Sequence, residues 1–377
     1  MTDRWAPLIT RWIDAGVMDE DTAIRIRAFE LQHADAGRLR WPIRLALLFG
    51  AVTLAAGTLL FVSAHWDSLS PQVRFALVAS LVAMFHVGGA FTSERFPAMA
   101  TTLYAIGTVA LGAGIFLAGQ IFNLDEHWPG GLMLWTVGAA IAWMLVETWP
   151  QTALLAVLAP AWLTAEWSVA IQQRWSSTGY RVAACGSFLL ALAYFTARRD
   201  CDRVDVRRET LTWVGGIWLI LTALALAFDS VPFYYHDQTL PAGLRIVGWA
   251  VALGLPLIVA VAMRRRSAWP NLLAMLWVLV LVGLRPLPEV SFYLYAWWAI
   301  GAIALAAWGV RDARIERINM GAAIFAATVL TFYFSTVMDK LGRSTSLIGL
   351  GLLFLGGGWA IDRVRRRLVL EAHGGLS

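Results

Sequence analysis

Residues 244–263 read LRIVGWAVALGLPLIVAVAM, and the next three residues are Arg264, Arg265 and Arg266. This apolar run has the length of about 20 residues that a helix needs to cross the hydrocarbon core of a bilayer. Runs such as 219–226 do not alternate between polar and apolar residues, as the strands of a membrane barrel do. An apolar run followed by a short arginine cluster is typical of a transmembrane helix.

The composition of the whole chain agrees with this interpretation. The chain has 377 residues, of which 59% are hydrophobic and 15% are charged, and its mean hydropathy is +0.64. Soluble domains are typically about 45–50% apolar and about 25% charged. A soluble enzyme, a disordered chain and a disulfide scaffold are therefore disfavoured. The net charge of +5 comes from arginine clusters between apolar runs, so we expect the lipid bilayer, and no nucleic acid, as the partner.

Further runs of the same kind follow one another along the chain. Because lipid offers no partner to unpaired backbone groups, each run has to be a helix. Several runs are short, so ten or eleven spans are compatible with the sequence as well. The fold class that we predict is all-α, a polytopic transmembrane bundle of about 12 spans. The predicted spans are 43–63, 73–91, 98–122, 131–147, 151–167, 179–197, 211–228, 244–263, 269–284, 290–309, 317–334 and 346–361.

The distribution of basic residues predicts the orientation of the bundle. With the N-terminus inside, 23 of the 30 lysine and arginine residues lie on the inner side. Cytoplasmic connectors of membrane proteins carry such an excess. An odd number of spans before residue 197 would place the arginine cluster at 198–208 outside. We therefore expect a multi-pass protein of the bacterial cytoplasmic (inner) membrane, with both termini in the cytoplasm.

The first 40 residues have a different pattern and predict a short cytoplasmic helical hairpin. Gly16 is expected to end the first helix, and Asp19 to cap the second. The hairpin packs on the bundle or lies on lipid; the alternative is a regulatory or partner-binding module. The apolar face of the first helix is Trp5, Leu8, Ile9, Trp12 and Ile13, and that of the second is Ile24, Ala28 and Leu31.

Polar residues gather where the predicted helices meet the outer surface, above an interior almost free of ionisable groups. His86 is the main exception, and we interpret it as a satisfied bundle histidine. We expect a ligand-binding site at the outer mouth, formed by Trp66, Asp67, Gln120, Asp125, His127 and Trp128. Weaker candidates for metal ligands are His65, His127, His236 and Asp237. The alternatives are that these residues cap helices and anchor the interface, or that they act as general acids and bases.

Two local features complete the pattern. Ala110, Gly114 and Ala118 form a row of small residues on one face of the third span, which lets helices approach closely, and Gln120 follows this row. Cys185 lies in an apolar run and Cys201 in a charged connector, so we expect two reduced thiols rather than a disulfide. The chain has no HExxH, G-x-S-x-G or Walker A motif, and we assign no catalytic residue and no cofactor.

The N-terminal part, to about residue 155, resembles the bacterial predicted membrane proteins called "domain of unknown function 2157". The residues that carry this resemblance are WIDAGVM at 12–18 with Ala23 and Ile26, AHWD at 64–67, and GAGIFLAGQIF at 112–122 with Leu134 and Trp135. The C-terminal part is similar to "domain of unknown function 4401" through FYF at 332–334, Arg343 and Ser344. The resemblance implies a polytopic membrane protein and no particular activity. It divides the chain into the hairpin 1–40, spans 1–4 at 41–155 and spans 5–12 at 156–377.

These observations leave three functions open. We favour a non-enzymatic, permease-like bundle that binds a lipid or small molecule at its extracytoplasmic mouth. The second hypothesis is a membrane scaffold or sensor that acts through a membrane-protein partner or a second copy of the chain. The third is an enzyme that acts on a lipid-linked substrate at the outer face, with Asp67 and Asp125 as acid and base or as metal ligands.

Overall fold

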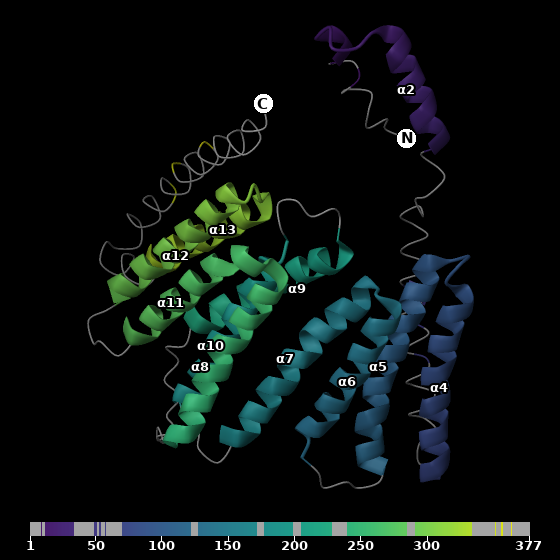
Figure 1. Ribbon diagram of the computed structural model, residues 1–377, viewed down its shortest axis with the longest axis vertical. Coiled ribbons are helices and arrows are strands. Elements are labelled where there is room, and N and C mark those ends of the chain that lie inside the picture. The colour runs from purple at the N-terminus through teal and green to yellow at the C-terminus, as the bar shows by residue number, and fades with distance from the viewer. Residues whose placement is uncertain are drawn as a thin grey trace. The chain divides into compact units, whose positions relative to one another are not determined.

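A computed structural model of the chain is shown in Figure 1. It describes residues 9, 12–33, 49–50, 53, 57, 70–121, 127–171, 177–198, 205–227, 240–284 and 291–333, together with 351, 356 and 363. The chain divides into two compact units, Met1–Arg74 and Phe75–Ser377. The regular elements in the described residues are all helices.

In the first unit, the described helix α2 runs over Glu20–His33. It begins directly after Asp19, whose backbone carbonyl accepts a hydrogen bond from the Ala23 amide at 3.1 Å. Gly16 lies in the left-handed region with φ +69°, where the preceding helical turn ends, as the sequence predicted. Ala23 is buried and Ile24 is 56% exposed, and the hairpin with its apolar faces stays a prediction.

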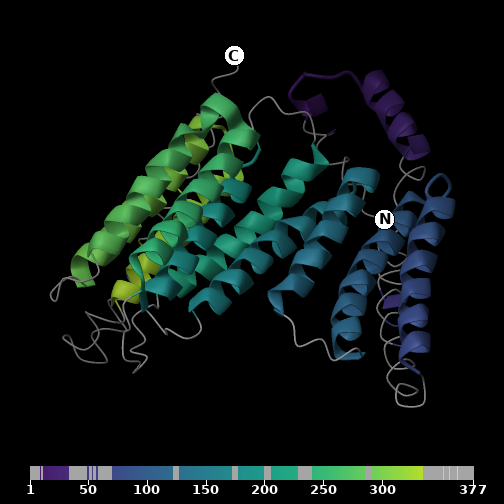
Figure 2. The same ribbon diagram turned by 60° about the horizontal axis from the view of Figure 1, so that its bottom comes forward.

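The described part of the second unit is a succession of helices from α4 to α13 (Figures 1 and 2). The first turn of α4 lies before the boundary at Arg74 and belongs to the first unit. The helices α4 to α7 lie side by side in both views. The bounds are α4 Pro71–Thr92, α5 Pro97–Ile121, α6 Pro129–Val146, α7 Trp149–Ile171, α8 Ser177–Phe195, α9 Val206–Ala227, α10 Ala242–Arg264, the 3-10 turn η2 Arg265–Ala268, α11 Trp269–Leu284, α12 Ser291–Arg311 and α13 Ile315–Phe332.

The helices α4 to α13 lie at the positions of the predicted runs from 73–91 to 317–334, but α8, at the predicted span 179–197, is not among the described helices that are long and apolar enough to cross a membrane. Eight stretches of the described residues are long and apolar enough to cross a membrane, and one of them, Ala242–Leu284, contains α10, η2 and α11. The predicted runs 43–63 and 346–361 lie outside the described residues, apart from isolated positions. The protein is a multi-pass membrane protein built of apolar helices.

Prolines mark where several of these helices begin. Pro71, Pro97 and Pro129 are the first residues of α4, α5 and α6. Pro150 and Pro270 are the second residues of α7 and α11. Proline suits the first turn because its fixed φ is already helical and the N–H that it lacks would have no partner within the helix. The sequence therefore determines these helix starts locally.

The packed core of the unit lies around α8. Every residue from 188 to 197 is buried. Phe188 and Leu192 of α8 belong to one hydrophobic cluster with Leu219 of α9, Val278 of α11 and Trp298 of α12. A helix that is apolar all round and surrounded by other helices fits the centre of a bundle. The end of α8 is thereby held in a fixed position relative to its neighbours.

Glycines allow the closest helix contacts. A Cβ on Gly215 of α9 would lie 2.3 Å from the backbone nitrogen of Phe195 in α8. A Cβ on Gly321 of α13 would lie 2.6 Å from the carbonyl oxygen of Ala302 in α12. Since backbone atoms cannot rotate away, only glycine permits these two approaches.

The predicted small-residue row of the third span faces α4. A Cβ on Gly114 of α5 would lie 2.5 Å from Val78 of α4. Gly107 of the same helix receives the ring of His86, whose Nδ1 donates to the Val82 carbonyl at 2.8 Å. His86 is therefore a satisfied side chain packed between two helices.

The outer surface of the bundle is apolar. Phe91 is 84% exposed, Leu145 79% and Trp213 70%. Soluble proteins expose single large apolar residues but not a surface made of them. In a bilayer these side chains contact acyl chains, which agrees with the membrane location.

Candidate functional site

The structure describes only part of the predicted outer mouth. His127 lies two residues before the first residue of α6, and Trp128 between them is 53% exposed. Gln120 lies in the last turn of α5, but its side chain is outside the description. The other residues predicted for this region, Trp66, Asp67, Asp125, His65, His236 and Asp237, lie outside the described residues. The assignment of a site to them stays a prediction.

His127 contacts a carboxylate that the sequence analysis did not single out. The distance from its Nε2 to Oε2 of Glu166 is 2.6 Å. Trp162, one turn earlier on α7, donates its Nε1–H to the other carboxylate oxygen at 3.0 Å. The Glu166 side chain is 36% exposed and that of His127 53%. Both carboxylate oxygens thus have a partner in a half-open environment at one end of the bundle.

Glu166 also lines a groove between α7, α8 and α10, with a volume of about 360 Å³. The groove extends from the helix ends near Glu166 and Leu244 to the middle of the helices at Pro160 and Pro256. Its walls are mainly apolar, and Glu166 is the ionisable residue among the described residues that line it. Pockets of about 300–1,000 Å³ with a few polar groups are typical of small-molecule sites.

Trp167 shapes the wall of this groove. Its indole Nε1 donates to the Gly179 carbonyl at 2.8 Å, which fixes the ring. A Cβ on Gly248 of α10 would lie 2.3 Å from the ring, so glycine leaves the room that the indole occupies. A carboxylate and an indole face at one end of an apolar groove suit a cationic group attached to an apolar chain.

A metal centre finds little support in this part of the chain. His127 and Glu166 supply two side chains of the kind that bind metals. The described residues contain no group of three or more His, Cys, Asp or Glu that could hold an ion. The metal hypothesis for His65, His236 and Asp237 stays a prediction.

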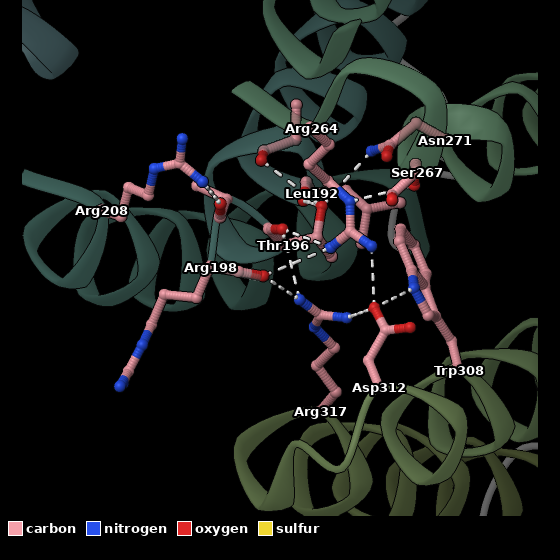
Figure 3. Close-up of polar contacts among 12 residues, drawn as sticks. Leu192, Thr196, Arg198, Arg208, Arg264, Ser267, Asn271, Trp308, Asp312 and Arg317 are labelled. Carbon is pink, nitrogen blue, oxygen red and sulfur yellow. Dashed lines mark hydrogen bonds and ion pairs between the residues drawn. The ribbon is translucent and has the colours of Figure 1, made fainter. Parts of the chain in front are cut away.

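A second polar arrangement is a buried cluster at the opposite end of the helices (Figure 3). Asp312, which follows α12, accepts a hydrogen bond from Arg264 Nη2 at 2.7 Å and one from Arg317 Nη1. Arg264 donates to the Thr196 carbonyl at 2.7 Å, and Arg317 donates to the Arg198 carbonyl at 2.9 Å. The cluster therefore joins the ends of α8, α10 and α12 to the start of α13.

The charges of this cluster are compensated although it holds two guanidinium groups and one carboxylate. Arg317 is 0% and Arg264 4% exposed. The carbonyls of Thr196 and Arg198 follow the C-terminus of α8, where the helix dipole places partial negative charge. Trp308 donates to the Asp312 carboxylate at 2.9 Å, and both guanidinium groups lie within 5.2 Å of its ring centre. Arg317 Nε has no hydrogen-bond partner among the described residues, but the contacts of the other guanidinium nitrogens make the cluster a structural connection between the helix ends.

The electrostatic state of Asp312 follows from two opposing effects. Burial penalises its charge and by itself would raise the pKa of the carboxyl group. Hydrogen bonds from Arg264 and Arg317, together with their positive charges, outweigh burial and lower the pKa below its ordinary value. Asp312 is therefore a carboxylate at neutral pH and holds the two arginines in place.

The sequence analysis used Arg264 and Arg317 only as markers of orientation. Both were counted in inner connectors, and neither was assigned a partner. The sequence does contain an indication of these ion pairs, because Asp312 is the acid that follows α12 in a connector expected on the same side as both arginines. For Glu166, the signal was a carboxylate in the last part of an apolar run.

Comparison with known proteins agrees with the N-terminal resemblance. No curated protein and no solved structure matches the chain. The likeness of the C-terminal part to "domain of unknown function 4401" stays a prediction. Residues 10–151, which contain α2 and α4 to α6, match the family model described as "Predicted membrane protein (DUF2157)", and this part of the chain is similar to that family.

Proposed function

We propose that the protein is a non-enzymatic, permease-like membrane bundle that binds a cationic amphiphile in the groove between α7, α8 and α10. The observation that carries this proposal is the carboxylate of Glu166 at one end of an otherwise apolar groove of about 360 Å³. The apolar walls accommodate a hydrocarbon chain, and Glu166 with Trp167 binds the head group. His127, which contacts Glu166, is the residue of the predicted outer mouth that the described contacts connect to this groove.

The chemistry of the groove supports a cationic rather than an anionic head group. Glu166 carries the negative charge, and no described lysine, arginine or histidine lines the groove. The indole of Trp167 presents a face that attracts cations. Prolines at positions 160 and 256 interrupt the hydrogen bonding of α7 and α10 beside the groove.

Photo-crosslinking in phosphatidylcholine nanodiscs tests the groove. The probes are a diazirine-bearing long-chain alkylamine and the matching alkanol and alkanoate. We expect the amine to label peptides of α7, α8 and α10 about tenfold more than the alkanoate, because a charged hydrogen bond contributes about 1.5–3 kcal/mol. Glu166→Gln should reduce amine labelling to the level of the alkanol.

A matched pair of variants on α10 controls for nonspecific effects. Val247 and Ile246 are both exposed, at 57% and 67%, but only Val247 lines the groove. Val247→Trp should block labelling by all three probes, whereas Ile246→Trp should leave it unchanged. Labelling that persists in Val247→Trp, or equal labelling by amine and alkanoate, would overturn the proposal.

We infer further that the connectors around the arginine cluster are cytoplasmic, in a bacterial inner membrane, with about 12 spans and both termini inside. Three arginine-containing connectors support this orientation, because Arg264, Arg317 and the carbonyl of Arg198 meet in one cluster. Arg207 of α9 also pairs with Glu147, which follows α6. Positively charged connectors stay on the cytoplasmic side.

Cysteine labelling tests this orientation. The chain has two cysteines, and Cys185 is buried in α8. In intact cells a membrane-impermeant maleimide should therefore leave Cys201 unlabelled. After the cells are opened, Cys201 should react with the same reagent. The positive control is Trp128→Cys, an exposed position at the opposite end, which should react in intact cells. Labelling of Cys201 in intact cells would contradict the proposed orientation.

A further inference from the structure

A second, larger cavity lies between α11 and α12, on different helix faces from the groove described above. Its volume is about 580 Å³, within the range of ligand pockets. Residues of both helices line its length, and Phe188, Leu219 and Ile324 lie at its base. Leu273 and Leu276, which line it from α11, are 53% and 48% exposed. The cavity is therefore open toward the lipid.

Tryptophans give this cavity stable walls. Trp277 donates its indole N–H to the Trp297 carbonyl at 3.0 Å, and Trp297 donates to the Trp277 carbonyl at 3.0 Å. The two rings stack with 7° between their planes, and Phe188 stacks on Trp277 at 5.9 Å. A Cβ on Gly301 would lie 2.7 Å from the Trp277 ring, so the absence of a side chain at Gly301 leaves space for this ring. The cavity is preformed rather than created by its ligand.

The length of the cavity matches one leaflet of a bilayer. It is lined along α11 from Trp269 to Val280. At 1.5 Å per residue this distance is about 16 Å. One leaflet contributes about half of the 30 Å hydrocarbon core, or about 15 Å. An acyl chain that enters from the membrane can therefore occupy the cavity along its length.

One end of the cavity carries positive charge. Arg311, the last residue of α12, lines the cavity there, and its guanidinium lies 4.6 Å from the ring centre of Trp269. Arg264 and Arg317 at the same end are held by Asp312, whereas Arg311 is exposed and has no hydrogen-bond partner within the described part of the chain.

We propose that this cavity is a binding site for an acidic phospholipid of the leaflet next to the arginine cluster. The phosphate and negative head group bind Arg311, and one acyl chain lies along the tryptophans between α11 and α12. This site lies between α11 and α12 and shares no lining residue with the groove beside Glu166, from which it differs in its end of the bundle and in the sign of its charge. The two proposals therefore stand independently.

Native mass spectrometry of the delipidated full chain tests this site. The protein is titrated in detergent with dioleoyl phosphatidylglycerol or with dioleoyl phosphatidylcholine, and the first bound lipid is counted. We expect phosphatidylglycerol to bind about tenfold more tightly, since a charged hydrogen bond is worth about 1.5–3 kcal/mol. Arg311→Gln should reduce this preference to threefold or less, about 0.7 kcal/mol.

The cavity itself is tested by a matched pair on α12. Ala304 lines the cavity, and Ile303 is its exposed neighbour that does not. Ala304→Phe should weaken binding of both lipids by about tenfold, whereas Ile303→Phe and the charge control Arg266→Gln should match the parent protein. An unchanged lipid preference in Arg311→Gln, unchanged binding in Ala304→Phe, or full competition by water-soluble glycerol phosphate would overturn the proposal. Val247→Trp, which fills the other groove, should not affect this measurement.

Discussion

We expect the Asp312→Ala substitution to lower the free energy of unfolding by about 3–5 kcal/mol relative to the parent protein. The carboxylate is the shared partner of Arg264 and Arg317, which are 4% and 0% exposed. Without it, two buried guanidinium groups of like charge face each other near the end of α8. Removal of one partner from a buried ion pair costs far more than the pair contributes, because the remaining charge has no compensation.

The measurement is unfolding in mixed detergent micelles, followed by the reaction of Cys185 with a fluorogenic maleimide. Cys185 is 0% exposed, and a Cys201→Ser background leaves it as the single thiol of the chain. The control is Asp205→Ala, which removes a half-exposed ion pair with Arg208 at 3.2 Å. Because Asp205 also accepts a hydrogen bond from the Arg207 amide at the start of α9, the expected cost of this substitution is about 1–2 kcal/mol. Equal effects of the two variants would contradict the structural role of the buried cluster.

The pH dependence of the same difference provides a second readout. The pKa of Asp312 is lowered in the folded protein, chiefly because the two arginines outweigh the effect of burial. The stabilisation by its carboxylate is therefore fully present above the unfolded pKa of about 3.9 and is lost as the pH falls through the lowered folded value. The difference in the free energy of unfolding between the parent protein and Asp312→Ala should be constant near neutral pH and should become smaller below about pH 4.

Gly215→Ala is expected to destabilise the bundle by about 3 kcal/mol, at the upper end of the range for overpacking. The added methyl group would lie 2.3 Å from the Phe195 nitrogen and 2.7 Å from the Ala191 oxygen. Both are backbone atoms of α8, so no side-chain rotation relieves the contact and α9 has to move away. The gain in helix propensity from glycine to alanine, about 1 kcal/mol, is smaller than this cost.

A second glycine separates the steric effect from helix propensity. Gly254 lies within α10, and a Cβ there would have no neighbour within 4 Å. Gly254→Ala should therefore leave the stability unchanged or raise it by up to about 1 kcal/mol. The same Cys185 assay measures both variants. A Gly215→Ala protein as stable as Gly254→Ala would show that α8 and α9 do not approach as closely as described.

Much of the fold was predictable because its causes are local. The apolar runs, the prolines at helix starts such as Pro97 and Pro129, and the turn at Gly16 depend on neighbouring residues only. The predicted runs 73–91 to 317–334 therefore lie at the positions of α4 to α13.

The site was only partly predictable. His127 was identified as a polar group at the outer mouth, but its contact Glu166 lies 39 residues away in the sequence. The middle of the predicted spans is almost free of ionisable groups, and the sequence alone indicates no partners for those near the helix ends. Asp312 and Arg264, 48 residues apart, were missed for the same reason.

The sequence by itself determined that the chain lies in a membrane, where most of its helices begin and end, and which connectors carry the arginines. Only the tertiary structure decided which helix faces meet, and so placed Glu166 beside a groove and Arg311 beside a second cavity. The physical reason is that helices in lipid are apolar on both their packed and their exposed sides. No contrast between polar and apolar faces then indicates the rotation of each helix, which is set by the fit of residues such as Gly215 and Trp277 against their neighbours.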